Sequence, residues 1–312
     1  MKPSDISYNF SVAKVLSILT VVAGHYLGGL LWIPTTVALF IFAFSSGYFS
    51  SNKYTGDFSI RKFWKAKVAR LLPGLALINL FLFVLFLLQG RSGVFTWDSL
   101  WGISGFSAAL AWFGIPYHSP FGFGQWFLTV LYIYYLAYPA IERINRNPAA
   151  ATALVLSALA VTTYLNFRVT VGYELWITVF AFMLGTYAGR MPARLTFSLS
   201  ALILAASIAS MLILNRLFSV NALNYYFILI SSVMACNILL VRRLPDALGP
   251  ILMPLSGCVL EIYLIHFYLF VRLPGSQAAG FALSLALILF SAMALGRVNS
   301  FLAAARGKPS PA

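Results

Sequence analysis

Ten long apolar runs constrain this chain more than any other feature. Each is about 20 residues long, the length that an α-helix needs to cross the hydrocarbon core of a bilayer. Of the 312 residues, 61% are hydrophobic and 9% are charged, whereas about a quarter of a soluble domain is charged. The sequence therefore predicts an all-α polytopic membrane protein with about ten transmembrane helices. The expected spans are residues 10–30, 32–50, 71–88, 123–141, 149–165, 173–188, 196–214, 225–241, 251–271 and 278–296.

The distribution of positive charge predicts how these spans are oriented. If the N-terminus is cytoplasmic, most Lys and Arg residues fall in cytoplasmic segments, as the positive-inside rule requires. The outer segments then hold Arg91, Arg168, Arg216 and Arg272. An odd number of spans would scramble this bias, so we expect both termini in the cytoplasm. Residues 1–312 are predicted to form a single integral-membrane domain.

The net charge of +14 does not indicate a nucleic-acid partner. The cations are spread over short loops and form no single basic face of the kind that nucleic acid requires. The inner segment 51–70 is nonetheless rich in Lys and Arg. These residues are either a topology signal in contact with anionic lipid or part of a site. The outer loop 89–122 is rich in Trp, as either an interfacial aromatic belt or a platform for a sugar. Both alternatives stay open at this point.

Two ionisable side chains, Lys14 and His25, lie inside the first span. Eleven residues on a helix give a net rotation of about 20°, so the two side chains share a face and stand about 16 Å apart along the axis. Ionisable groups in hydrocarbon are costly and normally face the protein interior. A long substrate with a charged tail and a reactive head would suit this face. His25 is then either a base that takes a proton from a hydroxyl or a neutral side chain in a contact between helices.

Lys67 and Arg70 are three residues apart where the third span begins. If this stretch is helical, they share a face at the inner mouth of the helix bundle. Ammonium and guanidinium groups placed in this way bind phosphate well, although plain positive-inside charge is the alternative. Pro73 follows them and fits a helix boundary or a kink.

Glu261 and His266 lie in the ninth expected span. A buried carboxylate without a partner is costly, so we expect Glu261 to pair with a cation or a histidine, or to be protonated. The five-residue offset places the two side chains about 140° apart around a helix, so we expect Glu261 to face another helix. In the second span, Ser45, Ser46 and Gly47 allow close approach between helices. We find no Ser–His–Asp triad, nucleotide P-loop or metal-ligand spacing.

Five sequence blocks, in order over most of the chain, resemble the membrane-bound acyltransferase-3 family. This family includes the O-acetyltransferases of bacterial surface polysaccharides. Lys14 followed by His25 is similar to its basic–histidine signature, and FWKAKVARLLP is similar to its basic-x-x-Arg motif before Pro. VALFIFAFSSGYF resembles the second-helix pattern, QWFLTVLYIYYLAYP the Trp-anchored fourth helix, and LEIYLIHF the late Tyr-Leu-x-His block.

The chain departs from the family pattern at three positions. Ser11 stands where many relatives have an acid, so that acid has no part in the expected mechanism. Lys14 replaces the commoner Arg, and Val259 stands where Ser is frequent. No hydrolase-like domain is appended, so we expect the membrane domain to complete the reaction or to pass the acyl group to a separate partner.

The resemblance implies an acyl-CoA-dependent O-acyltransferase in the bacterial inner membrane, with acetyl-CoA as co-substrate and no bound cofactor or metal. Its acceptor would be a hydroxyl of a sugar or cell-surface glycan. The implied roles are catalysis for His25 and Glu261, acyl-CoA binding for Lys14, Lys67 and Arg70, and acceptor contact or support of the other groups for Trp126, Tyr263 and His266.

A secondary transporter or flippase for a glycolipid is the alternative function. His25, Lys14 and Glu261 would then form a proton relay across the membrane. The chain has no repeated halves of the sort that transporter folds often show, which counts against this alternative. The sequence leaves the oligomeric state and the identity of the acceptor open.

Overall fold

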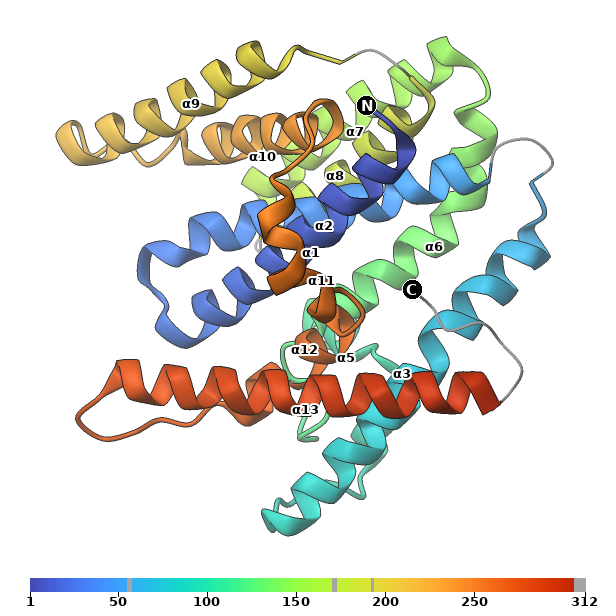
Figure 1. Cartoon of the computed structure of the whole chain (residues 1–312), viewed down its shortest axis with the longest axis vertical. Coiled ribbons are helices and arrows are strands. Elements are labelled where there is room, and N and C mark those ends of the chain that lie inside the picture. Colours follow the sequence, from blue (N-terminus) through green and yellow to red (C-terminus); the bar gives the residue numbers. More distant parts are fainter. Residues whose placement is uncertain (55–57, 170–172, 192–193, 306–312) are drawn as a thin grey trace. The chain divides into compact units, whose positions relative to one another are not determined.

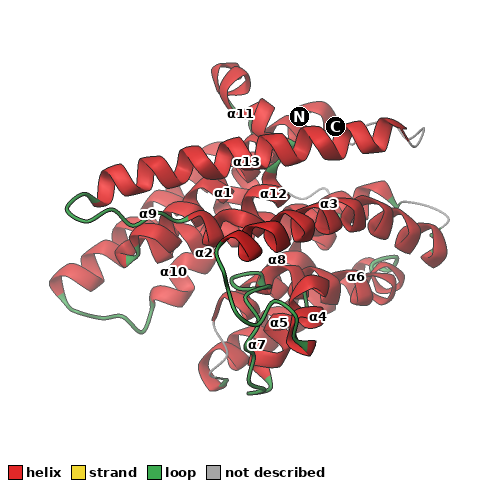
Figure 2. Ribbon diagram, turned by 90° about the horizontal axis from the view of Figure 1, so that it is seen from below, coloured by secondary structure: helices red, strands yellow, loops and turns green. Residues whose placement is uncertain are grey.

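The computed structural model describes residues 1–54, 58–169, 173–191 and 194–305, and every regular element in these ranges is a helix (Figures 1 and 2). This confirms the predicted all-α class. The chain groups into two compact units. The first unit comprises Met1–Gly24, Gly28–Gly56 and Ala140–Ser256, and the second comprises His25–Leu27, Asp57–Pro139 and Gly257–Ala312. Whether the chain acts as the single predicted domain stays a prediction.

Seven helices in the described residues are long and apolar enough to cross a bilayer. They are α1 (Pro3–Leu27), α2 (Trp32–Lys53), α3 (Ile60–Leu88), α7 (Pro148–Arg168), α9 (Phe197–Leu217), α10 (Asn224–Val241) and α13 (Gln277–Ala305). The broken pair formed by α11 (Gly249–Ser256) and α12 (Val259–Ile265) gives an eighth candidate if it is counted as one span.

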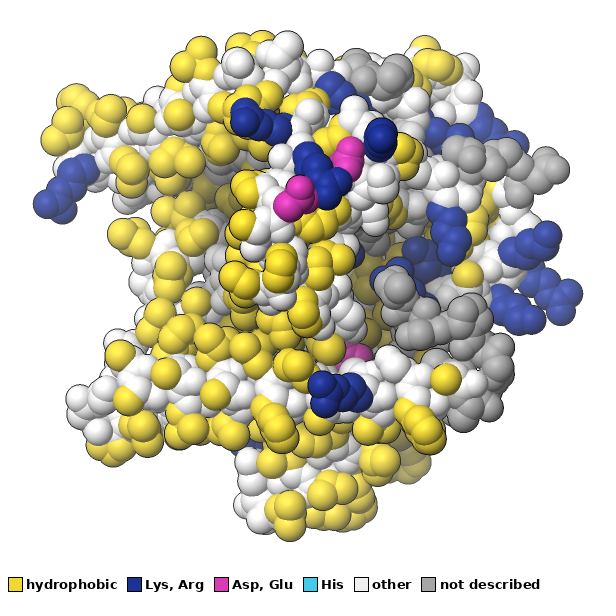
Figure 3. Space-filling model, in the orientation of Figure 1, with side chains coloured by type: hydrophobic (Ala, Val, Ile, Leu, Met, Phe, Trp, Pro, Cys, Tyr) yellow, Lys and Arg dark blue, Asp and Glu magenta, His cyan; other side chains and the backbone are white. Residues whose placement is uncertain are grey.

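Two further helices, α6 (Trp126–Ile144) and α8 (Tyr173–Arg190), coincide with predicted spans but are not among these seven. Hydrophobic side chains are spread widely over the face drawn in Figure 3, and Phe290 on α13 is 76% exposed. The chain is therefore a multi-pass membrane protein, while the count of ten spans and the cytoplasmic termini stay predictions.

The helix boundaries differ from the predicted ones in the first third of the chain. α1 ends at Leu27, because Gly28 adopts a left-handed φ of 70°. α3 begins at Ile60 and continues through Pro73 to Leu88. Pro73 is therefore not a helix boundary, and much of the segment 51–70 is helical rather than a loop.

The predicted ninth span is also not one continuous helix. α11 ends at Ser256, α12 begins at Val259, and a 3₁₀ turn, η3 (His266–Leu269), follows directly. The outer loop 89–122 contains two short helices, α4 (Trp97–Ser104) and α5 (Ser107–Trp112). The remaining 3₁₀ turns are η1 (Gly29–Leu31) and η2 (Asp246–Leu248).

In the first unit, α2 packs along α8, and α10 packs along α9 (Figure 1). Small residues bring α2 and α8 together. A Cβ atom at Gly47 would overlap the carbonyl of Phe182, and one at Gly185 would overlap the carbonyl of Phe44. The expected close helix approach at Gly47 is therefore confirmed.

Polar groups tie together the ends of helices within the first unit. The Glu142 carboxylate, which is 1% exposed, pairs with Arg190 at the end of α8. The Arg190 guanidinium also donates to the carbonyl of Tyr54, directly after α2, at 3.3 Å. Near the start of α1, Asn9 Nδ2 donates to the carbonyls of Leu239 at 2.8 Å and Arg242 at 2.7 Å, at the end of α10.

Candidate functional site

The second unit brings together two histidines that are far apart in the sequence. Nδ1 of His25 lies 2.8 Å from Nε2 of His266, and the two imidazole rings stack with centroids 5.1 Å apart and planes 11° apart. His25 lies in the last turn of α1, and His266 is the first residue of η3. His266 is fully buried, whereas His25 is half-buried. The sequence placed these two residues in the site but did not predict that they touch.

The last turn of α1 is held in place by the segment that follows η3. The hydroxyl of Tyr26 donates to the carbonyl of Val271 at 2.8 Å. In return, the guanidinium of Arg272 donates to the carbonyl of Tyr26 at 2.7 Å and lies 4.0 Å from the centre of its ring. These contacts hold the backbone directly after His25.

The hydrogen bonds define which nitrogen of each neutral imidazole carries the proton. Nδ1 of His266 lies 2.7 Å from the carbonyl oxygen of Tyr263, and a carbonyl can only accept. His266 Nδ1 therefore carries a proton, so its Nε2 accepts. His25 Nδ1 must then donate to it, which leaves the lone pair of His25 Nε2 available to take a proton or to attack an acyl group.

The backbone in and just after a glycine-rich turn, residues 121–124, holds the side chain of Tyr263 by two hydrogen bonds. Its hydroxyl donates to the carbonyl of Gly124 at 3.0 Å and accepts from the amide of Phe127 at 2.9 Å. Gly124 has a left-handed φ of 72°, and a Cβ atom there would overlap the ring of Phe267. Tyr263 thus holds His266 through its carbonyl, while its own side chain is held by the glycine-rich turn.

Two residues that the sequence analysis did not single out, Phe267 and Gln125, lie on the segments that carry the histidine pair and its support. The ring of Phe267 lies 4.6 Å from that of His25 and 4.7 Å from that of His266, measured between centroids. Gln125 is 1% exposed, and its Nε2 donates to the carbonyl of Leu264 at 3.4 Å. Its Oε1 is buried without a partner in the described residues. The sequence feature that could have identified Gln125 is a polar amide between Gly124 and Trp126 in an otherwise apolar block.

Glu261 lies away from the histidine hydrogen bonds, at a contact between three helices. It is 4% exposed on α12, and its Oε1 would be 3.9 Å from a Cβ atom at Gly74 on α3. Nδ2 of Asn299 on α13 would be 3.5 Å from the same atom. This agrees with the expectation that Glu261 faces another helix. No ion pair of Glu261 occurs among the described residues, and its catalytic role stays a prediction.

Lys67 and Arg70 lie on one continuous helix, so the condition for a shared face is met. The ammonium of Lys67 lies 4.3 Å from the ring centre of Tyr135 on α6 and 5.2 Å from that of Phe63. Arg70 is exposed. Both belong to the second unit, together with the histidine pair, and their role in phosphate binding stays a prediction.

The remaining predicted site residues are Lys14 and Trp126. Lys14 is half-buried on α1, within the first unit. Trp126 is the first residue of α6, and its ring lies 5.7 Å from that of Phe127. In the part of the chain that the structure describes, no group of three or more His, Cys, Asp or Glu side chains could hold a metal ion.

Comparison with protein-family models gives a match over nearly the whole chain. A family model described as an acyltransferase domain, acyltransferase-3, matches residues 7–297 and so covers every site residue that the sequence predicted. No curated protein and no solved structure matches the chain.

Proposed function

This chain belongs to the acyltransferase-3 family, whose model matches nearly its whole length, and we propose that it is an acyl-CoA-dependent O-acyltransferase. Family membership supports a membrane acyltransferase in general. The proposal adds acetyl-CoA as the donor, a hydroxyl of a sugar or cell-surface glycan as the acceptor, and the bacterial inner membrane as the location.

The observation that carries the proposal is the free Nε2 of His25, which the hydrogen bonds to His266 and Tyr263 leave unprotonated. This nitrogen takes the proton of the acceptor hydroxyl as the oxygen attacks the thioester carbonyl. The carbon–sulfur bond breaks, and the CoA thiolate leaves with the proton that His25 returns. The same lone pair would serve a route in which His25 carries the acyl group first and the acceptor oxygen attacks it afterwards.

The acyl donor would be held through its phosphates by the cations at the start of α3. Lys67 and Arg70 share a face there, and the Tyr135 ring orients the Lys67 ammonium. Lys14, on the same helix as His25, supplies a further cation. Glu261 would support the site from the contact of α12 with α3, and Trp126 would contact the acceptor.

The decisive experiment is acyl transfer from radiolabelled acetyl-CoA by the purified protein and by His25→Ala. A positioned base is worth about 10²- to 10⁴-fold in rate. We expect His25→Ala to lose measurable transfer and CoA release while it still inserts into the membrane. The matched control is His118→Ala, since His118 is exposed in the outer loop and should not affect the rate.

Three outcomes would contradict the proposal. Normal transfer in His25→Ala would remove His25 from the mechanism. Equal losses in His25→Ala and His118→Ala would show a non-specific effect. Counterflow of a glycolipid in vesicles, without release of CoA thiol by the unaltered protein, would favour the transporter alternative.

A further inference from the structure

A cavity of about 330 Å³ opens in the first unit, away from the groups used above. Its lining includes Trp32, Asn166, Phe167, Asn221 and Tyr225. These residues come from the start of α2, the end of α7 and the segment that leads into α10. The volume lies at the lower end of the range for small-molecule sites, about 300–1,000 Å³.

The cavity has an apolar floor and an aromatic rim. Tyr225 is 8% exposed and Ile228 is 2% exposed, so they form the floor. Trp32 and Phe167 are 37% and 53% exposed and place aromatic rings at the rim. The negative face of an aromatic ring attracts polarised C–H groups, which line the flat faces of sugar rings.

Amide groups supply the polar part of the lining. Oδ1 of Asn166 is buried and has no hydrogen-bond partner in the described residues. A buried acceptor without a donor is unfavourable, and a ligand hydroxyl would satisfy it. Asn221 places a second amide at the exposed rim. Aromatic faces together with amides are suited to a ring that carries several hydroxyls.

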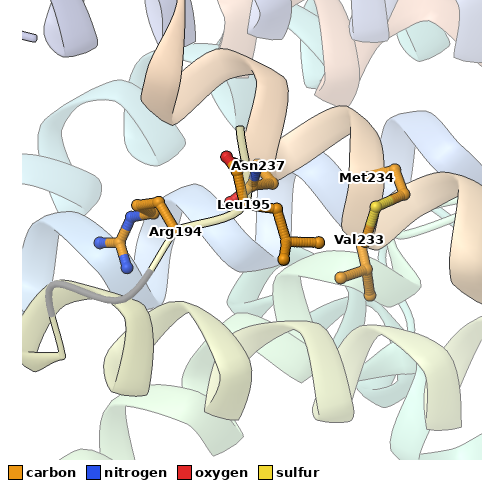
Figure 4. A pocket seen from close by; sticks show the side chains of 5 residues that line it. All are labelled: Arg194, Leu195, Val233, Met234 and Asn237. Carbon is orange, nitrogen blue, oxygen red and sulfur yellow. Dashed lines mark hydrogen bonds between the residues drawn. The ribbon is translucent and has the colours of Figure 1, made fainter. Parts of the chain in front are cut away.

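A second cavity in the same unit lacks this chemistry. It measures about 250 Å³ and is lined by Arg194, Leu195, Val233, Met234 and Asn237 (Figure 4). The Arg194 guanidinium donates to the carbonyls of Ala188 and Met191, at the end of α8. Asn237 Nδ2 donates to the carbonyl of Leu195 at 2.9 Å and to Ser200 Oγ at 2.7 Å. These polar groups of the lining already have hydrogen-bond partners within the protein.

We propose that the larger cavity binds a carbohydrate ring, stacked on Trp32 and Phe167 and hydrogen-bonded to Asn166. In the orientation that the charge bias predicts, the start of α2, the end of α7 and the start of α10 are all outer ends, so the ring would belong to a sugar outside the cell. The inference goes beyond the acyl-transfer proposal, since this binding requires neither His25 nor acyl-CoA.

The test is saturation-transfer NMR on the full chain carrying His25→Ala, in phosphatidylcholine nanodiscs, with glucose, N-acetylglucosamine and rhamnose as probes. Sugar-headgroup detergents are avoided because they would compete. We expect transfer to the ring C–H protons of at least one probe. We also expect about tenfold weaker binding in Trp32→Ala and Asn166→Leu, from the lost ring face and hydrogen bond. Phe218→Ala is the matched control, since Phe218 is 64% exposed and does not line the cavity, and Trp97→Ala tests the outer loop.

Trp32→Ala and Asn166→Leu could lose binding through misfolding, so a third variant that fills the cavity is needed. Ala222 is an exposed lining residue, so Ala222→Trp should block the cavity, keep the thermal unfolding temperature and abolish the signal. The proposal is overturned if none of the three probes receives saturation. It is also overturned if Ala222→Trp binds normally, or if Trp97→Ala alone removes binding, which would locate the sugar at the outer loop.

Discussion

The proton position on His25 is set by a backbone carbonyl, that of Tyr263, acting through His266. A carbonyl does not titrate, so it holds the His266 tautomer without placing a second charge in the membrane interior. A carboxylate in the same position would have to be desolvated at considerable cost. The site can therefore orient His25 without a carboxylate. Glu261 lies on α12, directly before η3, and forms no ion pair among the described residues.

His266 is expected to act as a positioning residue, and its replacement should lower turnover more than substrate binding. His266→Ala removes the acceptor for His25 Nδ1, and one hydrogen bond contributes about 0.5–1.5 kcal/mol, or up to about tenfold in rate. We expect this loss in kcat, with the KM for acetyl-CoA nearly unchanged. His266→Gln should recover part of the rate, since its amide oxygen can accept the same hydrogen bond.

Steady-state kinetics with His118→Ala as the control would check this. A change in KM alone for His266→Ala, or a His266→Gln variant no better than His266→Ala, would contradict the positioning role and indicate a packing role instead.

The cations of α3 should affect the donor rather than the chemical step. Hydrogen bonds to charged groups contribute about 1.5–3 kcal/mol, so Lys67→Ala and Arg70→Ala should each raise the KM for acetyl-CoA about tenfold or more. Lys65→Ala is the matched control, since Lys65 is an exposed cation on the same helix. A fall in kcat at constant KM in Lys67→Ala and Arg70→Ala would argue against phosphate binding.

Among the elements, the contact between the glycine-rich turn and η3 shapes the site. The turn lies directly before α6, and its Gly124 has a left-handed backbone and no room for a side chain beside Phe267. Phe267 in turn touches both imidazole rings. η3 follows α12 directly, so Phe267 and His266 reach this turn from the end of α12.

Gly124→Ala should destabilise the protein and reduce transfer together. The left-handed backbone costs an L-residue about 1–2 kcal/mol, and the overlap with Phe267 adds to this. Gly114→Ala is the matched control, because Gly114 has a φ of 67° but nothing within 4 Å of its would-be Cβ. Thermal unfolding in detergent should show a clearly larger decrease for Gly124→Ala. Equal decreases in the two variants would mean that the contact with Phe267 is unimportant.

On the scale of the whole molecule, the ten-span prediction depends on whether α6 and α8 cross the bilayer. Within the first unit, Trp32, Asn166 and Tyr225 line one cavity. The start of α2, the end of α7 and the start of α10 therefore lie on the same side of the membrane. If α6 did not cross the bilayer, Trp32 and Asn166 would lie on opposite sides of the membrane, and if α8 did not cross, Asn166 and Tyr225 would. The shared cavity therefore favours crossings by both helices.

Cysteine labelling with a membrane-impermeant maleimide tests this arrangement, since Cys236 and Cys258 are buried. We expect Phe113→Cys to be labelled in intact cells, and Arg61→Cys and Arg146→Cys only after permeabilisation. All three positions are exposed. Labelling of Arg146→Cys from outside would show that α6 does not cross, and labelling of Arg61→Cys from outside would reverse the predicted orientation.

The sequence by itself determined the all-helical membrane class and the family, and it singled out His25, His266 and Tyr263 as candidate site residues. Hydrophobic run length and residue spacing depend on local chain properties, so they can be read without coordinates. Tertiary structure alone decided that the helix continues through Pro73, that the ninth span breaks, and that His266 rather than Glu261 contacts His25. These outcomes depend on which backbone and side-chain groups meet across distant segments, and a one-dimensional pattern does not contain that information.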